Sequence, residues 1–355
     1  MAAGKVAVVT GAANGGEGKH WLGSVRGRLL LSLGFALLVL MGLTLFADSR
    51  KLADALRGFR WPLLAPILLL TSFNYALRFV KWQYYLRRVG ITELPTHLSA
   101  RIFFANFTMA MTPGKVGEVF KSLLLREAVG TPIAVSAPII VVERMTDGIA
   151  MLLLASVGLV IFRYGVPVFA TIALLGALGL LLLQQRWLIR RIIDAGERIR
   201  PLAAFTHHVH TFYDSTYALL RPVPLLFATI IGLVSWLGEC VAFFLVLVGL
   251  GFAGTPRLLL TAMFVLAAAS LIGSVSLLPG GLGAAEIGMT AMLLALITDP
   301  LMTHDVAVAA TLLIRFCTLW FGVALGLVAL TTVRGLLGGR KRVAKKTLAG
   351  VLHGD

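Results

Sequence analysis

The sequence predicts an all-α, polytopic integral membrane protein with about six full spans and two re-entrant hairpins broken by Pro-Gly turns, arranged as an inverted repeat. Three observations predict this fold: a very apolar composition, long runs without charge, and a Pro-Gly motif that occurs once in each half. Hydrophobic residues make up 58% of the 355 residues and charged residues only 14%, with a mean hydropathy of +0.91. A soluble chain of this length needs more charge to cover its surface. The composition therefore excludes a soluble enzyme.

Apolar runs of roughly 18 to 20 residues can cross a ~30 Å hydrocarbon core as helices. Residues 29–47, 166–183 and 223–250 are such runs. The net charge of +16 comes from Lys and Arg between the apolar runs and in the C-terminal tail. This placement fits contact with anionic lipid headgroups and not with nucleic acid. The two cysteines, Cys240 and Cys317, lie within apolar segments, and we expect both to be buried.

The N-terminal stretch KVAVVTGAANGGEG at residues 5–18 resembles the opening strand and glycine turn of a short-chain dehydrogenase. A dinucleotide site needs a complete βαβ unit and the rest of its sheet. Here the first apolar run begins at residue 29. We therefore expect no cofactor, and we interpret residues 1–27 as a disordered cytoplasmic tail.

Lys and Arg also predict the orientation, because they collect on the cytoplasmic side of inner-membrane proteins. The basic segments 186–222 and 335–355 are placed inside as a linker and a tail, so that both termini are cytoplasmic. Between the tails, a membrane domain at 28–334 contains two repeats, at about 61–185 and about 223–334. Residues 48–60 hold basic side chains on the opposite side, and we interpret them as an amphipathic surface helix.

Two Pro-Gly motifs interrupt apolar segments. The first is Pro113-Gly114-Lys115-Val116-Gly117-Glu118, and the second runs from Pro279 and Gly280 through Gly283 to Glu286. Proline stops a helix and glycine lets the backbone turn, so each motif predicts a helix–turn–helix hairpin that enters the membrane and returns. Such backbone needs protein or water around it. Two oppositely inserted hairpins are typical of secondary transporters.

Charged residues within the apolar segments form the candidate site, because a charge near the bilayer centre costs on the order of 2.5 to 3.5 kcal/mol. The predicted substrate-binding residues are Arg78, Lys81, Pro113, Gly114, Gly117, Glu118, Lys121, Glu143, Arg144, Asp147, Pro279, Gly280, Gly283, Glu286 and Arg315. Residues 143–147 place two carboxylates and an arginine three or four positions apart, along one helical face.

Two interpretations of these charges stay open. The set can be buried ion pairs that fix helix packing. Alternatively, Arg78, Arg144 and Arg315 bind a phosphate headgroup through their planar forks, while carboxylates form pairs or carry a coupling proton. The hairpin turns would add backbone donors at helix N-termini. The His207, His208 and His210 group lies in the basic linker, so we expect a solvated face there and no metal site.

Five segments together resemble a known family: RFVKW at 78–82, FFANFTMAMTPGKVGEVFKSLLLRE at 103–127, VVERMTDG at 141–148, LLPGGLGAAEIG at 277–288 and LIRFCTLWFGVALG at 313–326. The chain resembles the lysylphosphatidylglycerol synthase transmembrane-domain family, a flippase-like membrane region. The likeness covers roughly residues 28–334. The family commonly has Arg where this chain has Lys81, which keeps the charge but loses the bidentate fork.

The resemblance implies movement of a lipid, or of a lipid-linked intermediate, between leaflets. The sequence has no room after its last span for the soluble aminoacyl-transferase domain of the two-part family members, so we do not expect synthase activity. We therefore predict a lipid transporter for an anionic or polyprenyl-phosphate-linked lipid, with membrane lipids as partners and no enzymatic activity. Two alternatives remain: a non-transporting partner of a cell-envelope or glycolipid biosynthetic enzyme, and an intramembrane enzyme acting on lipid phosphates. The second would require a metal motif that we do not find.

Overall fold

The computed structural model describes residues 49–111, 117–162, 166–197, 200–276 and 278–333. Over these ranges all the regular structure is helical and no strand occurs, so the all-α prediction is confirmed there. The elements in chain order are α2 (Ser49–Arg57), η1 (Trp61–Leu63), α3 (Leu64–Arg88), α4 (Thr96–Ala105), η2 (Asn106–Met111), α5 (Phe120–Val129), α6 (Ile133–Phe162), α7 (Val166–Gln184), α8 (Arg186–Glu197), α9 (Arg200–Leu219), α10 (Pro222–Gly249), α11 (Pro256–Val275), η4 (Pro279–Gly281), α12 (Ala284–Leu296), α13 (His304–Arg315) and η5 (Phe316–Trp320).

Long apolar helices confirm the polytopic membrane class. Five described segments have the length and hydropathy to cross a membrane: Trp61–Arg88, Pro222–Gly249, Pro256–Val275, Pro279–Leu296 and His304–Val333. A sixth is added if Ala170–Gln184 and Arg186–Gly196, which meet at 73°, form one broken span. The 30-residue α6 is also about 45 Å long, but it carries charges near its middle. The exact number of spans stays a prediction, and the run at 29–47 lies outside the described residues.

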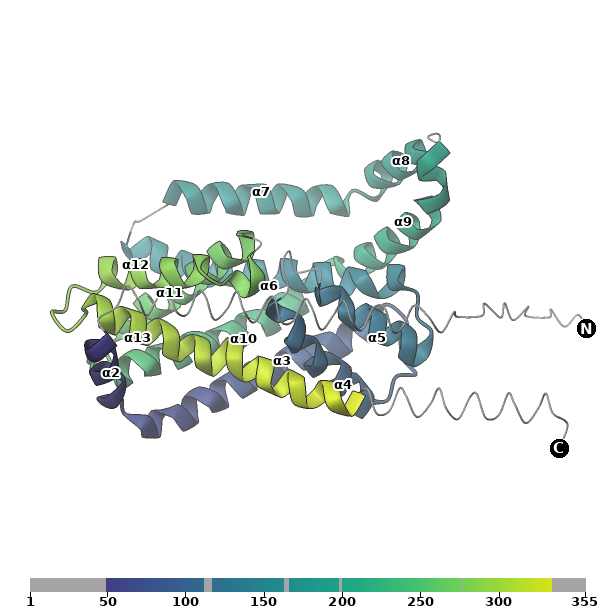
Figure 1. Ribbon diagram of the computed structural model, residues 1–355. Coiled ribbons are helices and arrows are strands. Elements are labelled where there is room, and N and C mark those ends of the chain that lie inside the picture. The colour runs from purple at the N-terminus through teal and green to yellow at the C-terminus, as the bar shows by residue number, and fades with distance from the viewer. Residues whose placement is uncertain (1–48, 112–116, 163–165, 198–199, 277, 334–355) are drawn as a thin grey trace, which may run out of the picture.

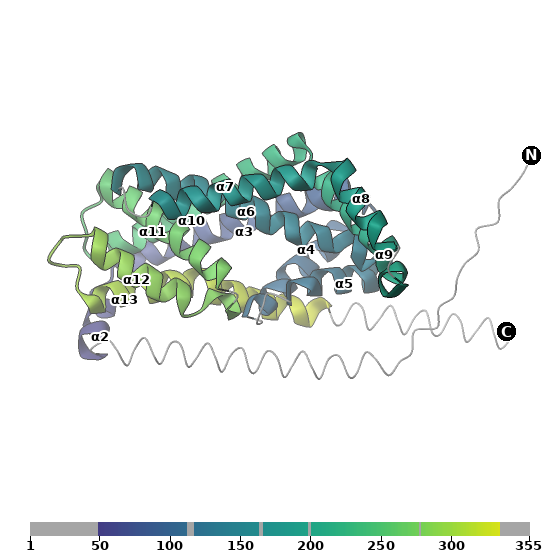
Figure 2. The ribbon, with the colours of Figure 1, turned by 90° about the horizontal axis from the view of Figure 1, so that it is seen from above.

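Helix α10 is the centre of the bundle and packs against α3, α6, α11 and α13 (Figure 1, Figure 2). Its buried positions include Ala228, Gly232 and Gly238, and small residues let helices approach closely within a membrane. Asn74 on α3 donates a hydrogen bond to the Ser235 carbonyl at 3.0 Å. Ser235 donates back to the Asn74 carbonyl at 3.3 Å, so polar and close contacts together join α3 to α10.

Two helical hairpins occupy opposite ends of the bundle. Helices α4 and α5 lie at one end, and α11 and α12 pack against each other at the other (Figure 1). The α11–α12 hairpin turns through η4, where Gly280 and Gly281 have φ of 61° and 68°, values that glycine adopts without strain. A side chain added at Gly281 would lie 2.9 Å from the Gly273 backbone. The turn is therefore packed tightly against α11.

The two hairpins approach each other, since η2 contacts η4 and a Cβ added at Gly280 would lie 3.6 Å from the Ala110 carbonyl oxygen. The first predicted turn, at Pro113 and Gly114, lies outside the described residues. The last helix runs from His304 to Val333 and contains α13 and η5. Within η2, Asn106–Met111, the backbone approaches this helix so closely that a Cβ on Gly326 would lie 2.7 Å from the Thr108 nitrogen.

A π-helical turn, η5, follows Arg315 and interrupts the regular hydrogen bonding of the last helix. Tyr75 on α3 donates a hydrogen bond to the Thr318 carbonyl in this turn at 2.5 Å. Turns of this type are frequent at functional sites. Here it joins the last helix to α3 beside the residues described below.

The predicted linker at 186–222 is largely helical and contains α8 and α9. Helix α9 packs against α6, and Tyr213 donates a hydrogen bond to the Leu183 carbonyl at 3.1 Å. His207 and His208 are exposed, as expected for a solvated face. Helix α7 presents exposed leucines from Leu174 to Leu182, which suits a helix that faces lipid.

The amphipathic helix predicted at 48–60 is confirmed in its helical part as α2. It buries Leu52 against Val308 and Ala309 of α13. Its basic residues Arg50, Lys51 and Arg57 belong to the helix. On which side of a membrane it lies stays a prediction.

Candidate functional site

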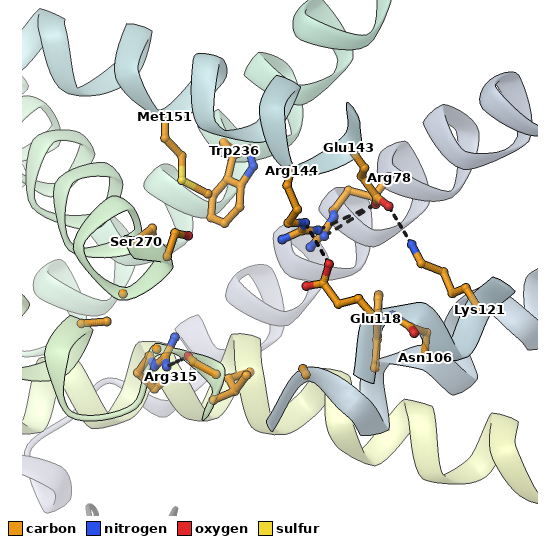
Figure 3. A pocket seen from close by; sticks show the side chains of 18 of the residues that line it. Arg78, Asn106, Glu118, Lys121, Glu143, Arg144, Met151, Trp236, Ser270 and Arg315 are labelled. Atoms are coloured by element: carbon orange, nitrogen blue, oxygen red, sulfur yellow. Dashed lines mark hydrogen bonds and ion pairs between the residues drawn. The ribbon is translucent and has the colours of Figure 1, made fainter. Parts of the chain in front are cut away.

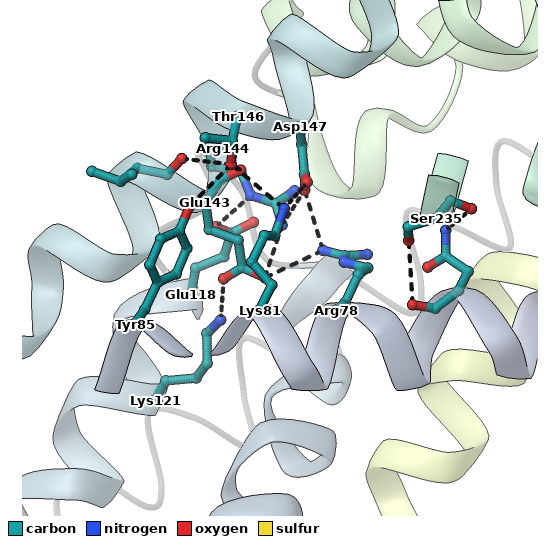
Figure 4. Close-up of polar contacts among 12 residues, drawn as sticks. Arg78, Lys81, Tyr85, Glu118, Lys121, Glu143, Arg144, Thr146, Asp147 and Ser235 are labelled. Carbon is teal, nitrogen blue, oxygen red and sulfur yellow. Dashed lines mark hydrogen bonds and ion pairs between the residues drawn. The ribbon is translucent and has the colours of Figure 1, made fainter. Parts of the chain in front are cut away.

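A cluster of charged side chains lies where α3, α5 and α6 meet (Figure 4). We call it the central cluster. It comprises Arg78, Lys81, Glu118, Lys121, Glu143, Arg144 and Asp147. With four basic and three acidic members, its net charge is +1 when all are ionised. Helix α6 supplies three of them because residues 143, 144 and 147 project from neighbouring positions of adjacent turns.

Two short ion pairs form the buried base of the central cluster. Lys81 Nζ lies 2.5 Å from Asp147 Oδ1, and Lys121 Nζ lies 2.6 Å from Glu143 Oε2. All four side chains are at most 4% exposed. Thr146 lies within 3.5 Å of Lys81 Nζ and adds a hydroxyl contact. Buried pairs of this length are costly to break, because the remaining charge is left in an apolar interior.

The two arginines of the central cluster are held more loosely. Arg78 Nη2 lies 3.6 Å from Asp147 and 3.8 Å from Glu143, while Arg144 Nη2 lies 3.3 Å from Asp147. Arg144 Nε is 3.5 Å from Glu118, and its side chain is 33% exposed. The Nε atoms of Arg78 and Arg144 are buried and make no hydrogen bond with any residue that the structure describes. Both guanidinium groups therefore keep donors for a further acceptor.

A second polar group forms at the N-terminus of α12. Arg315 Nε lies 2.5 Å from Glu286 Oε1, and Arg315 Nη2 donates to the Gly280 carbonyl at 2.8 Å. Glu286 Oε2 accepts a hydrogen bond from the Gly283 backbone N–H at 2.7 Å. Glu286 thus caps the helix and orients Arg315, which holds the turn to the last helix.

A cavity of about 200 Å³ separates the central cluster from this second group (Figure 3). It is lined by Arg78, Phe103, Asn106, Phe107, Ala110, Glu118, Lys121, Glu143, Arg144, Met151, Trp236, Ser270, Gly273, Ser274, Gly280, Gly281, Ala285, Arg315 and Leu319. Three arginines from three helices thus line one cavity. A neighbouring cavity of about 150 Å³ shares Arg78, Trp236 and Arg315 with it and adds Tyr75 and Glu239.

Two residues that line the first cavity carry an uncharged polar atom without a partner among the described residues. Asn106 Oδ1 and Trp236 Nε1 are buried and make no hydrogen bond among the described residues. A buried polar atom without a partner costs about 1 to 3 kcal/mol. The residues that line this cavity therefore contribute one acceptor and one donor that the described residues leave without a partner.

The structure brings together most of the residues predicted from the sequence. Seven of them line the first cavity: Arg78, Glu118, Lys121, Glu143, Arg144, Gly280 and Arg315. Lys81 and Asp147 lie behind the cavity wall as a buried pair. Pro279, Gly283 and Glu286 shape the turn, Gly117 precedes α5, and Pro113 and Gly114 lie outside the described residues.

Several cavity residues were not predicted from the sequence. Asn106 and Trp236 are uncharged, so a criterion based on intramembrane charge does not distinguish them from their neighbours. Ser270 and Ser274 lie four positions apart on α11, with Gly273 between them, and all three line the cavity. Such a stripe of small polar residues on an apolar helix is a usable signal, although helix packing produces it too.

The fold and site define a polytopic helical membrane protein with a charged cavity inside its bundle. Comparison of the sequence with known families identifies it further. The sequence model described as the lysylphosphatidylglycerol synthase TM region matches residues 29–326, and the chain belongs to this family. A UPF0104 membrane protein of Methanothermobacter thermautotrophicus (strain ATCC 29096 / DSM 1053 / JCM 10044 / NBRC 100330 / Delta H) is 24% identical over 324 residues, which cover 82% of this chain and 90% of the relative. The family predicted from the five motifs is confirmed.

Proposed function

We propose that this protein moves an anionic lipid, or a lipid linked through a polyprenyl phosphate, between the two leaflets of the inner membrane. The observation that carries the proposal is that Arg78, Arg144 and Arg315 line one cavity, and that the Nε atoms of Arg78 and Arg144 have no hydrogen-bond partner among the described residues. A phosphate diester offers anionic oxygens, and guanidinium groups bind them with charge-assisted hydrogen bonds. The acyl chains would stay among the lipid tails.

The charge of the lining supports an anionic ligand. The central cluster carries one more basic than acidic side chain, and the Arg315–Glu286 pair is balanced. Without a surplus of positive charge, the buried carboxylates would repel the negatively charged phosphate of a headgroup. One phosphate matches the surplus.

A transport cycle requires that the cavity open alternately to the two sides. We propose that the α4–α5 and α11–α12 hairpins are re-entrant and enter from opposite sides, with both chain termini cytoplasmic. The positions of these hairpins at opposite ends of the bundle, with η2 against η4, support this arrangement (Figure 1). Two similar halves in inverted orientation can exchange conformations to give alternating access.

Reconstitution into liposomes tests the proposal. A headgroup-intact phosphatidylglycerol with a fluorophore on one acyl chain reports leaflet exchange when a membrane-impermeant reductant bleaches the outer leaflet. We expect the full chain to accelerate exchange of this lipid over protein-free liposomes, and to move it faster than a phosphatidylcholine with the same fluorophore. Exchange at the protein-free rate for phosphatidylglycerol and for a polyprenyl phosphate would overturn the proposal and favour a non-transporting role.

A further inference from the structure

Glu239, near the middle of α10, is a buried carboxylate that belongs to none of the ion pairs described above. Its residue exposure is 6%, and it faces the second cavity. The other carboxylates of the cavity region have partners: Glu143 pairs with Lys121 and Glu286 with Arg315. Among the described residues, Glu239 makes neither an ion pair nor a side-chain hydrogen bond that would stabilise its charge.

The groups that face Glu239 do not neutralise it. Helix α3 contributes Tyr75 and Arg78, and the last helix contributes Arg315. The hydroxyl of Tyr75 donates to the Thr318 carbonyl, so it is already engaged. Arg78 and Arg315 lie beyond ion-pair distance from Glu239 and contact other carboxylates.

Three further titratable groups lie on α10 itself or on the helices packed against it. Asp147 on α6 is paired with Lys81, while Cys240 on α10 and Cys317 in η5 are buried free thiols. None of them offers Glu239 a positive charge. Burying an unpaired charged carboxylate costs free energy, and uptake of a proton removes this cost.

Counting the charges links Glu239 to the anion site. The two cavities are lined or backed by five basic residues: Arg78, Lys81, Lys121, Arg144 and Arg315. They are balanced by Glu118, Glu143, Asp147, Glu286 and Glu239. Among the described residues the sum is therefore zero with Glu239 ionised and +1 with Glu239 protonated.

We propose that Glu239 is a proton-binding site coupled to the lipid phosphate, so that the anionic headgroup binds together with one proton. This inference rests on the proposed function and adds its coupling ion. The phosphate would bind at Arg78 and Arg315, which line both cavities, and its charge would repel an ionised Glu239. Binding of either partner therefore favours the other, as linkage requires.

The proton step leaves the lipid covalently unchanged. A proton from cavity water adds to one carboxylate oxygen of Glu239 when the phosphate arrives, and it returns to water when the phosphate leaves. The headgroup then crosses with its single charge balanced. A pH difference across the membrane can consequently drive net lipid movement.

The fluorescent phosphatidylglycerol assay, run with equal pH inside and outside the liposomes, tests this inference. A phosphodiester carries one charge throughout the range from pH 6 to pH 8, so a change in rate reports the protein. We expect the wild-type rate to fall roughly tenfold from pH 6 to pH 8, within the usual range of coupling between sites. Glu239→Gln should move lipid at a rate that changes less than twofold over this range. The matched control is Glu93→Gln, which removes the same charge from an exposed loop residue and should keep the wild-type profile.

The two hypotheses fail in different ways. Exchange of both phosphatidylglycerol and a polyprenyl phosphate at the protein-free rate at every pH would refute the proposed function, whereas active wild-type protein whose pH profile survives in Glu239→Gln would refute only the coupling. Calorimetric binding of a short-chain phosphatidylglycerol to the full wild-type chain, in buffers of different ionisation enthalpy, decides the matter if Glu239→Gln does not accumulate. Uptake of close to one proton per lipid supports the coupling, and uptake of none overturns it.

Discussion

Two substitutions separate ion pairs that hold the fold together from charges that act on a ligand. Lys121→Met removes the partner that lies 2.6 Å from the buried Glu143 and leaves that carboxylate with arginines at 3.8 and 3.9 Å. Removing one partner of a buried pair costs about 3 to 5 kcal/mol. Because two arginines still approach Glu143, we expect a loss near the lower limit, about 3 kcal/mol. The double variant Lys121→Met/Glu143→Gln removes both charges and should recover most of this loss.

Arg144→Gln should behave differently. Its side chain is 33% exposed to the cavity and its ion pairs are 3.3 to 3.9 Å long, so screening reduces their contribution to about 1 kcal/mol or less. We expect Arg144→Gln to accumulate to about the wild-type level and to have a melting midpoint close to that of the wild type. Exchange of phosphatidylglycerol should nevertheless be lost. Glu118→Gln should likewise abolish exchange with near-normal expression.

Thermal midpoints in detergent, read from the remaining monodisperse protein by size-exclusion chromatography, together with the liposome assay, give both quantities for each variant. Arg60→Gln is the matched control because Arg60 is exposed in the loop before η1. If Arg144→Gln melts as low as Lys121→Met, or if it keeps the wild-type exchange rate, the separation of roles is incorrect. The arginine would then serve packing.

Three further predictions follow from close contacts, unpaired atoms and surface pairs. Gly326→Ala places a Cβ 2.7 Å from the Thr108 backbone nitrogen, so it should destabilise the protein by about 1 to 3 kcal/mol and slow lipid exchange. The control Gly176→Ala has open space around the added Cβ, so it should change the melting midpoint little and leave the rate of lipid exchange unchanged. Trp236→Phe removes an indole N–H that has no partner among the described residues, so it should leave the melting midpoint nearly unchanged while weakening binding of phosphatidylglycerol severalfold. Equal affinity in a binding titration would contradict a headgroup contact. Asp214 is partly desolvated, but its hydrogen bonds and ion pairs with Arg190 and Arg186 lower its pKa. Their contribution to the stability of the fold is therefore present above the ordinary carboxyl pKa and is lost as the pH falls through the lowered pKa. Because these groups are nearly half exposed, Asp214→Asn should shift the melting midpoint at pH 7 only slightly.

The sequence was sufficient for the class of fold and for the membership of the charged cluster. Composition alone predicts a membrane bundle, because too few charges exist to cover a soluble surface. Spacing within α6 correctly placed Glu143, Arg144 and Asp147 on one face. Spacing along a helix acts over one or two helical turns, so this prediction does not depend on how distant segments pack.

Pairing between distant segments could not be predicted in this way. That Arg315 pairs with Glu286, and Lys121 with Glu143, depends on how helices pack, which no local spacing reveals. Glu239 stands out in the sequence only as a carboxylate within the apolar run 223–250, and the packed structure is needed to reveal that it has no cation at ion-pair distance among the described residues. Trp236 was missed because an aromatic residue in an apolar helix gives no polar signal.

The central claim is that an anionic headgroup binds between the three arginines, and photocrosslinking tests it most directly. A phosphatidylglycerol with a photoreactive group on its headgroup would be irradiated with the full chain in liposomes, and the labelled peptides identified by mass spectrometry. We predict labelling within η2 and around Ser270 and Ser274 of α11, suppressed by excess unlabelled phosphatidylglycerol and absent in Arg144→Gln. Labelling confined to lipid-facing surfaces such as α7, and unchanged in Arg144→Gln, would contradict the account.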